Sequence, residues 1–213
     1  MEILYSDDRV IVCIKPAGVL STDESGGMPE LLRRELRDPD AVVKSVHRLD
    51  RTVGGVMVYA RTKRAASDLG RQVAGGTFGK GYLAVVRGRP AEDSGTLRQW
   101  LLRDRAARRT LVVPEGTENA QEAILEYAVL DTRDGHSLLS VRLKTGRTHQ
   151  IRCQLASVGC PIVGDRKYGH GVDGEFPALW SHKIRFAHPR TGETMTFRAP
   201  PPETEPWNTF AIP

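Results

Sequence analysis

Short apolar runs separated by turn residues are the dominant pattern along this chain. β-Branched and apolar residues fill positions 9–15, 56–60 and 82–86, and glycine or proline follows the first and last of these runs. Runs of this length and composition are typical of β-strands. Further strands are predicted by the same pattern at residues 111–113, 123–130, 138–143, 180–186 and 193–197. An Asp134-Gly135 turn and a turn over 189–192 would close two hairpins among them.

Three segments instead space their apolar residues as a helix does. Residues 29–37 carry three Leu on one side, and residues 63–74 form an amphipathic pattern that ends at a Gly-Gly pair. Residues 148–158 also predict a helix, with Thr148 as its expected N-cap. Many strands and few helices predict an α+β fold, built on a mixed, largely antiparallel sheet flanked by helices and loops.

The chain has 213 residues and shows no internal repeat, low-complexity segment or linker, so we expect one domain over residues 1–213. It contains no apolar run of 18 residues and no visible signal peptide, which predicts no membrane span. Its three cysteines lack CxxC spacing, as expected for reduced thiols in the cytoplasm. A monomer is the default expectation.

Arginine dominates the basic residues of the chain. The formal net charge is +5, and 24 of the 31 basic residues are Arg. The guanidinium group makes planar, bidentate bonds to phosphate and stacks on bases, so this bias favours a nucleic-acid partner. Codon usage rich in G and C would produce the same bias without any such partner.

The stretch HRLDRTVGGV at residues 47–56 places Asp50 between Arg48 and Arg51. Three interpretations fit these residues: a structural ion pair, a phosphate-binding loop, and a catalytic carboxylate kept ionised by neighbouring cations. Gly54 and Gly55 would let backbone or substrate approach closely. The local residues do not decide among the three.

A second stretch, KTGRTHQIRCQLASVGC at residues 144–160, combines a glycine turn with a predicted helix start. Arg147, His149 and Arg152 gather near that start, where the helix dipole and free N–H groups favour an anion. An ordinary helix start with a solvated basic face explains the same residues. A zinc site formed by His149 with Cys153 and Cys160 is a third interpretation, but no fourth ligand is in place.

Three stretches in order, HRLDRTVGGVMVYART, GKGYLAVVRG and LKTGRTHQIRCQLASVGCPIVGDRKYG, resemble the sequence motifs of the RluA-like pseudouridine synthase family. RVIVCIKPAGVLS resembles the opening strand and Lys-Pro-Ala-Gly turn of that family, and WSHKIRFAHPRTGETMTFRAPPP resembles its closing hairpin. The resemblance covers roughly residues 3 to 202. It implies the pseudouridine synthase fold with an active-site cleft, and isomerisation of uridine to pseudouridine in rRNA or tRNA without cofactor or metal.

The resemblance also implies roles for individual residues. Asp50 matches the catalytic aspartate, Tyr82 the tyrosine that stacks on the target base, and Arg152 the arginine that pairs with the catalytic carboxylate. Arg48 matches an arginine that fills the space left by the flipped nucleotide. The remaining expected RNA contacts are His47, Arg51, Arg147, His149 and Gln150.

One departure from the family is visible. Many relatives read HRLDRDTSG, whereas Thr52, Val53 and Gly54 follow Arg51 here, so the segment behind the aspartate has lost an acid and a hydroxyl. Many relatives also carry a separate N-terminal RNA-binding domain, which we do not expect here because the resemblance to the catalytic domain begins near residue 3. The choice of target would then come from the catalytic domain, aided by the basic stretch 98–109, although a solvated face explains that stretch as well. Two other functions stay open: a catalytically silent RNA-binding module, and a metal-dependent phosphodiesterase using His47, Asp50 and His149.

Overall fold

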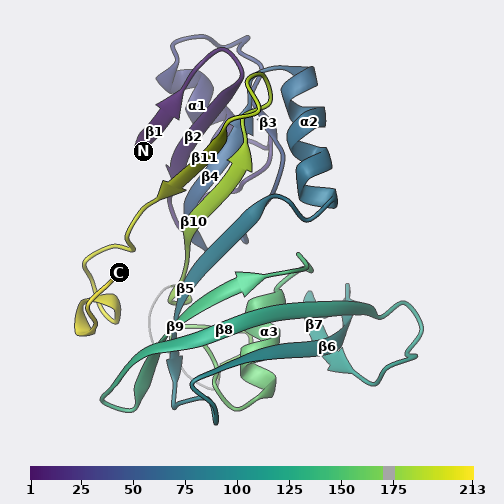
Figure 1. The fold of residues 1–213 in the computed structure, drawn as a ribbon, viewed down its shortest axis with the longest axis vertical. Helices are drawn as coiled ribbons and strands as arrows, with labels where there is room; N and C mark the ends of the chain where they lie inside the picture. The colour runs from purple at the N-terminus through teal and green to yellow at the C-terminus, as the bar shows by residue number, and fades with distance from the viewer. Residues whose placement is uncertain (170–175) are drawn as a thin grey trace. The chain divides into compact units, whose positions relative to one another are not determined.

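The computed structural model of the chain describes residues 1–169 and 176–213, in two compact units (Figure 1). Unit 1 comprises residues 1–80 and 181–200, and unit 2 comprises residues 81–180 and 201–213. That the whole chain forms one domain stays a prediction.

Unit 1 is a sheet with two helices. Its helices are α1 (Met28–Glu35) and α2 (Lys63–Ala74), and its strands are β1 (Ile3–Ser6), β2 (Val10–Lys15), β3 (Lys44–Ser45), β4 (Gly54–Ala60), most of β10 (Leu179–Ala187) and β11 (Thr194–Arg198). The sheet order is β1-β2-β4-β10-β11, with β3 added to β4. The pairs β1–β2, β2–β4, β3–β4 and β10–β11 are antiparallel.

Strand β4 lies at the centre of unit 1. All seven of its residues are buried, which explains why its sequence GGVMVYA is apolar throughout and does not alternate. It pairs with β2 from Val10 opposite Ala60 to Lys15 opposite Gly55. This register sets the loop before β4 beside the end of β2.

Helix α2 has the residues 63–74 that the sequence predicts. The Thr62 side chain accepts a hydrogen bond from the Ala65 amide at 3.0 Å, which caps the first turn. Ala65 and Leu69 face the core of unit 1, and Gly76 ends the segment at φ +72°. The helix therefore follows the ordinary rules of capping and amphipathic burial.

Unit 2 contains a five-stranded antiparallel sheet and the third helix. Its strands are most of β5 (Gly79–Arg87), then β6 (Ser94–Asp104), β7 (Arg109–Val113), β8 (Gln121–Arg133) and β9 (His136–Leu143); its helices are α3 (Gln150–Ser157) and the short 3₁₀ helix η1 (Trp207–Thr209). The sheet order is β5-β9-β8-β6-β7, and Asp134-Gly135 closes the β8–β9 hairpin as predicted. Helix α3 packs against β6 and β7 (Figure 1).

The α+β class and the largely antiparallel sheet are confirmed. The predicted strands all exist, and six of the eight are two to five residues longer than expected, whereas the helix expected over 148–158 is shorter, Gln150–Ser157. Thr148 as its N-cap is wrong: the N-cap is His149, with left-handed φ of +55° and no capping hydrogen bond from its side chain. Instead, the Gln150 side chain accepts a hydrogen bond from the Arg147 amide at 3.0 Å, and this bond organises the turn before the helix.

Candidate functional site

The loop that carries Asp50 connects β3 to β4 in unit 1. Asp50 is half-buried. Its backbone carbonyl accepts a hydrogen bond from the Val53 amide at 3.0 Å, in a turn that leads directly into β4. Leu49 precedes Asp50, and its backbone is bound by the buried Ser21 hydroxyl. This hydroxyl donates to the Leu49 carbonyl at 2.9 Å and accepts the Leu49 amide at 3.1 Å. The backbone on the N-terminal side of Asp50 is therefore fixed by a buried side chain.

A buried lysine fixes the backbone on the other side. Lys15 is fully buried, and its Nζ donates to the carbonyls of Pro16 at 2.9 Å, Val19 at 2.6 Å and Arg51 at 3.1 Å. Burial lowers its pKa to about 8, while the charge of Asp50 raises it. Lys15 is thus a cation that anchors the loop and interacts electrostatically with Asp50. The Lys-Pro-Ala-Gly turn is visible in the sequence, but the role of this lysine is not.

We expect Lys15→Met to lower the free energy of unfolding by roughly 2–4 kcal/mol, because three backbone carbonyls lose their donor together. The matched control is Lys167→Met, since the Lys167 Nζ donates to one exposed carbonyl, that of Arg108 at 2.7 Å. That control should cost less than about 1 kcal/mol. Chemical denaturation followed by circular dichroism measures both. Equal losses in the two variants would contradict the anchoring role.

The two arginines beside Asp50 have different surroundings. Both side chains are exposed, but the Nε of Arg51 donates to the Gly18 carbonyl at 2.8 Å, and the Arg51 carbonyl accepts the Gly18 amide at 2.8 Å. Arg51 therefore ties the loop to the turn after β2. The Arg48 side chain is also exposed, and it forms no comparable hydrogen bond with residues 1–169 or 176–213.

His47 lies in the core of unit 1. Its side chain is 8% exposed, its Nε2 accepts the Val58 amide at 3.2 Å, and its ring lies 5.1 Å from that of Phe78. Burial and, to a lesser extent, the charge of Lys80 lower its pKa to about 3, so the imidazole is neutral at physiological pH. A neutral, packed ring provides no charge for RNA, and we leave His47 out of the proposed RNA contacts.

The Gly-Gly pair after the loop makes room for backbone. Gly55 has φ of +123°, and a Cβ there would lie 2.3 Å from the Ser181 carbonyl oxygen on β10. Any larger residue at position 55 would collide with that strand. The close approach at Gly55 is therefore an approach of backbone.

Tyr82 and Arg152 belong to unit 2. Tyr82 lies on β5 opposite Val141 of β9 and is 6% exposed. Arg152 lies in the first turn of α3, where its Nε donates to Asp165 Oδ2 at 2.7 Å and its Nη2 donates to Asp165 Oδ1 at 2.8 Å. This bidentate partner was not predicted, although Asp165 lies within the motif PIVGDRKYG. The roles of Tyr82 at the base and of Arg152 at Asp50 stay predictions.

The start of α3 holds the other predicted RNA contacts. Arg147 is exposed and its Nε donates to the Glu122 carbonyl at 3.0 Å. His149 Nδ1 lies 2.8 Å from the Tyr168 hydroxyl. Gln150 is 2% exposed, and its Nε2 has no hydrogen-bond partner within the described part of the chain. Arg147 is therefore the side chain of this group best placed for a ligand in solution.

The β6–β7 hairpin carries a cluster of cations, which we call the arginine hairpin. Its members are Arg103, Arg105, Arg108 and Arg109. All four are exposed, and none forms an ion pair with a described carboxylate. Elsewhere, exposed arginines commonly do, as Arg89 does with Asp93. Positive charge is therefore concentrated here in unit 2.

In residues 1–169 and 176–213 no three His, Cys, Asp or Glu side chains group as metal ligands would. The Cys153 thiol donates instead to the Thr110 carbonyl at 3.2 Å. Among the described helices, none is long and apolar enough to cross a membrane.

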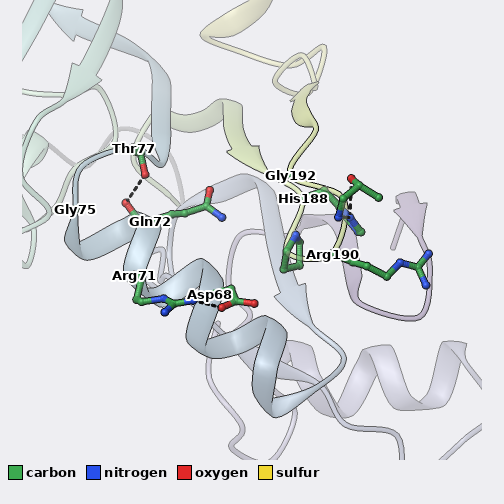
Figure 2. Close-up of a pocket in the computed structure, with 10 residues that line it drawn as sticks. Asp68, Arg71, Gln72, Gly75, Thr77, His188, Arg190 and Gly192 are labelled. Carbon is green, nitrogen blue, oxygen red and sulfur yellow. Dashed lines mark hydrogen bonds and ion pairs between the residues drawn. The ribbon is translucent and has the colours of Figure 1, made fainter.

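A pocket of about 580 Å³ lies between α2 and the β10–β11 turn in unit 1 (Figure 2). Arg71 and Arg190 line it, but each pairs with a carboxylate, Asp68 and Asp8 respectively. The Gln72 side chain closes one wall through two hydrogen bonds of 2.8 Å with the backbone of Ala187. None of the predicted site residues lines this pocket.

Comparison with known proteins identifies relatives over most of the chain. The family described as RNA pseudouridylate synthase matches residues 9–157. An uncharacterized RNA pseudouridine synthase of Bacillus subtilis, YlyB, is 33% identical over 95% of this chain and 70% of its own length. Ribosomal large subunit pseudouridine synthase D of Xanthomonas campestris is 34% identical over 95% of this chain and 66% of its own length.

Solved structures share the fold. Human RNA pseudouridylate synthase domain containing 1 has a TM-score of 0.81 at 24% identity, covering 95% of this chain and 84% of that one. Human RNA pseudouridylate synthase domain containing 4 has a TM-score of 0.79 at 22% identity, covering 94% of this chain and 88% of that one. These similarities confirm the predicted fold.

Proposed function

Because the chain belongs to the RNA pseudouridylate synthase family, a family of isomerases, we propose that it converts specific uridines of rRNA or tRNA to pseudouridine, with Asp50 as the catalytic group. The observation that carries this proposal is the geometry of the Asp50 loop. Ser21 and Lys15 anchor the backbone on either side of one half-buried carboxylate, with a buried ammonium interacting with it. A carboxylate on a loop that is anchored on both sides, and that interacts with a buried ammonium, suits the role of a nucleophile or base.

The reaction breaks the bond from uracil N1 to ribose C1′ and forms a bond from C5 to C1′, so the C5 proton leaves and N1 gains one. The base has to leave the stack first, which costs a few kcal/mol. In the proposal Tyr82 supports the flipped base, Arg48 fills the gap, and Arg152 pairs with Asp50. Stacking on an aromatic ring offsets about 1–3 kcal/mol of the cost.

The test is release of tritium from in vitro transcripts of rRNA and tRNA that contain 5-tritiated uridine. The wild-type protein should release tritium from at least one transcript with EDTA present, and the modified uridine is then mapped in that transcript. The name of the relative from Xanthomonas campestris makes large-subunit rRNA the first transcript to test. Binding to every transcript without release would favour a silent RNA-binding module, and release of cleaved RNA that EDTA abolishes would favour the phosphodiesterase.

We propose further that the arginine hairpin contacts RNA phosphates. Replacing both Arg105 and Arg108 by Gln should weaken RNA binding and reduce the slope of log K against log salt by about 1–2, because each lost phosphate contact releases fewer counterions. The control replaces Arg89 and Arg133 by Gln, since both pair with carboxylates, Asp93 and Asp131.

The measurement is a filter-binding titration at several salt concentrations, from about 50 to 200 mM. The control variant should keep the wild-type slope. An unchanged slope in the Arg105 and Arg108 variant would exclude the hairpin as a phosphate contact, whatever the wild-type affinity.

A further inference from the structure

The Arg152 side chain is fixed in unit 2 by hydrogen bonds along one edge and by an aromatic ring on one face. Its guanidinium forms two parallel hydrogen bonds with Asp165, of 2.7 and 2.8 Å, and the two side chains are 8% and 0% exposed. Its carbon Cζ also lies 5.3 Å from the centre of the Tyr168 ring. A planar group bound along one edge and covered on a face has little rotational freedom left.

The carboxylate that holds Arg152 is itself fixed by backbone. Asp165 Oδ1 accepts the amides of Lys167 at 3.0 Å and Tyr168 at 3.2 Å, and the Asp165 carbonyl accepts the Gly169 amide at 2.7 Å. Burial raises the pKa of Asp165, but the hydrogen bond and charge of Arg152, together with the amides of Lys167 and Tyr168, outweigh burial, and the pKa falls below its usual range. Asp165 is therefore a rigid anion in a closed turn.

Tyr168 connects this turn to two other elements of unit 2. Its hydroxyl accepts the Thr110 amide of β7 at 2.7 Å and lies 2.8 Å from His149 Nδ1 at the start of α3. The Cζ atom of Arg109, a member of the arginine hairpin, lies 5.3 Å from the centre of the same ring. The turn, the hairpin and the helix start are thus joined at the position of Arg152.

Stability alone does not account for such a pair. Desolvation of two buried charges offsets most of their attraction, and apolar residues of similar volume often serve a fold equally well. What the bidentate pair does provide is orientation, since it uses Nε and one Nη2 hydrogen and directs the other N–H groups of the guanidinium. That matters if Arg152 has to meet one carboxylate in one geometry.

We propose that Asp165 is the positioning residue of Arg152: it sets the guanidinium plane so that Arg152 can serve the Asp50 carboxylate during catalysis. This inference rests on the proposed function. In this proposal Asp165 contacts neither the substrate nor the reacting atoms, and it acts only through Arg152.

The test is a double-mutant cycle with Asp165→Asn, Arg152→Lys and both together. Asn keeps the Oδ1 that accepts Nη2 and the two amides, and replaces only the Oδ2 that accepts Nε, so it changes orientation with little change in shape. Asp131→Asn is the matched control, since Asp131 pairs with Arg133 near the surface of the same unit. Single-turnover tritium release is normalised to the folded fraction from thermal melts.

Asp165→Asn should lower kcat at least about tenfold with KM for RNA unchanged, because a displacement of about 1 Å in a catalytic site can cost 100-fold. The double variant should stay within about twofold of Arg152→Lys alone, since effects that run through one residue do not add. Wild-type kcat in folded Asp165→Asn, or a double variant that loses the product of both effects, would overturn the proposal. If Asp165→Asn does not fold, Asp165→Glu replaces it, with its carboxylate displaced by one methylene and the same expected loss.

A second measurement does not depend on activity. In ¹⁵N-edited NMR of the wild-type protein, the Nε–H of Arg152 should exchange slowly with solvent, and its signal is identified by its absence in Arg152→Lys. Loss of that protection in Asp165→Asn supports the proposal, and an unprotected wild-type signal or unchanged protection overturns it. If the wild type releases no tritium from any transcript, the proposed function fails, and the NMR result still decides whether Asp165 holds Arg152.

Discussion

Asp50→Asn should fold, bind RNA with near wild-type affinity and form no pseudouridine. Asn is nearly isosteric with Asp but is neither an anionic nucleophile nor a base. The loop should keep its place, because Ser21 and Lys15 hold the backbone of Leu49 and Arg51 and do not depend on the Asp50 carboxylate for those bonds. Binding should survive because phosphate contacts supply most of it.

Tritium release beside a thermal melt separates this result from a structural role. A structural ion pair predicts the reverse pattern, lower stability with turnover retained in the folded fraction. Asp40→Asn is the matched control, an exposed aspartate in the same unit that should keep full activity. Single-turnover release by well-folded Asp50→Asn, free of wild-type contamination and deamidation, would overturn the assignment of Asp50.

Most of the fold follows from sequence because its elements obey local rules. Runs of β-branched and apolar residues predict strands β2 and β4, and the Thr62 cap and the terminal glycines predict helix α2. Strand β6 was missed, because its sequence SGTLRQWLLRD mixes polar and apolar residues on a half-exposed strand and its arginines suggested only a basic stretch. Strand β1 has four residues, too few for a periodic pattern.

The candidate site is likewise predictable from sequence only in part. Motifs placed Asp50, Tyr82 and Arg152 on the sequence, and the structure puts the first on a loop anchored at both sides. The anchors themselves lie far away along the chain, since Lys15 is 36 residues from Arg51. Pairings of this kind come from sheet register and loop packing, which a single sequence does not encode locally.

Partners and roles are harder to read than positions. Asp165 lies within a quoted motif, yet its bond to Arg152 depends on how the turn after α3 folds back. For His47 the motif alone favoured RNA, whereas the Val58 amide and the Phe78 ring show a packed, neutral side chain. Matching a residue type to a motif therefore says less about its role than its burial and hydrogen bonds do.

Tyr82→Ala should lower turnover far more than it lowers RNA binding, by roughly 10–100-fold, the equivalent of the 1–3 kcal/mol that stacking on one base supplies. Tyr82→Phe should keep ground-state RNA binding, because the face of the ring survives. Since Tyr82 is 6% exposed, Tyr82→Ala should also reduce stability, by about 3–5 kcal/mol as other large-to-small changes in cores do. Activity therefore has to be measured per folded molecule.

Leu83→Ala supplies the matched control for that loss of stability. Leu83 is the next residue on β5, is 1% exposed, and points to the opposite face of the sheet because side chains alternate along a strand. Both alanine variants should melt at lower temperature, but only Tyr82→Ala should lose turnover in its folded fraction. Loss of turnover per folded molecule therefore distinguishes a tyrosine that supports the base from one that only packs in the core. Equal turnover per folded molecule in the two variants would show that Tyr82 serves the core of unit 2 and does not support the base.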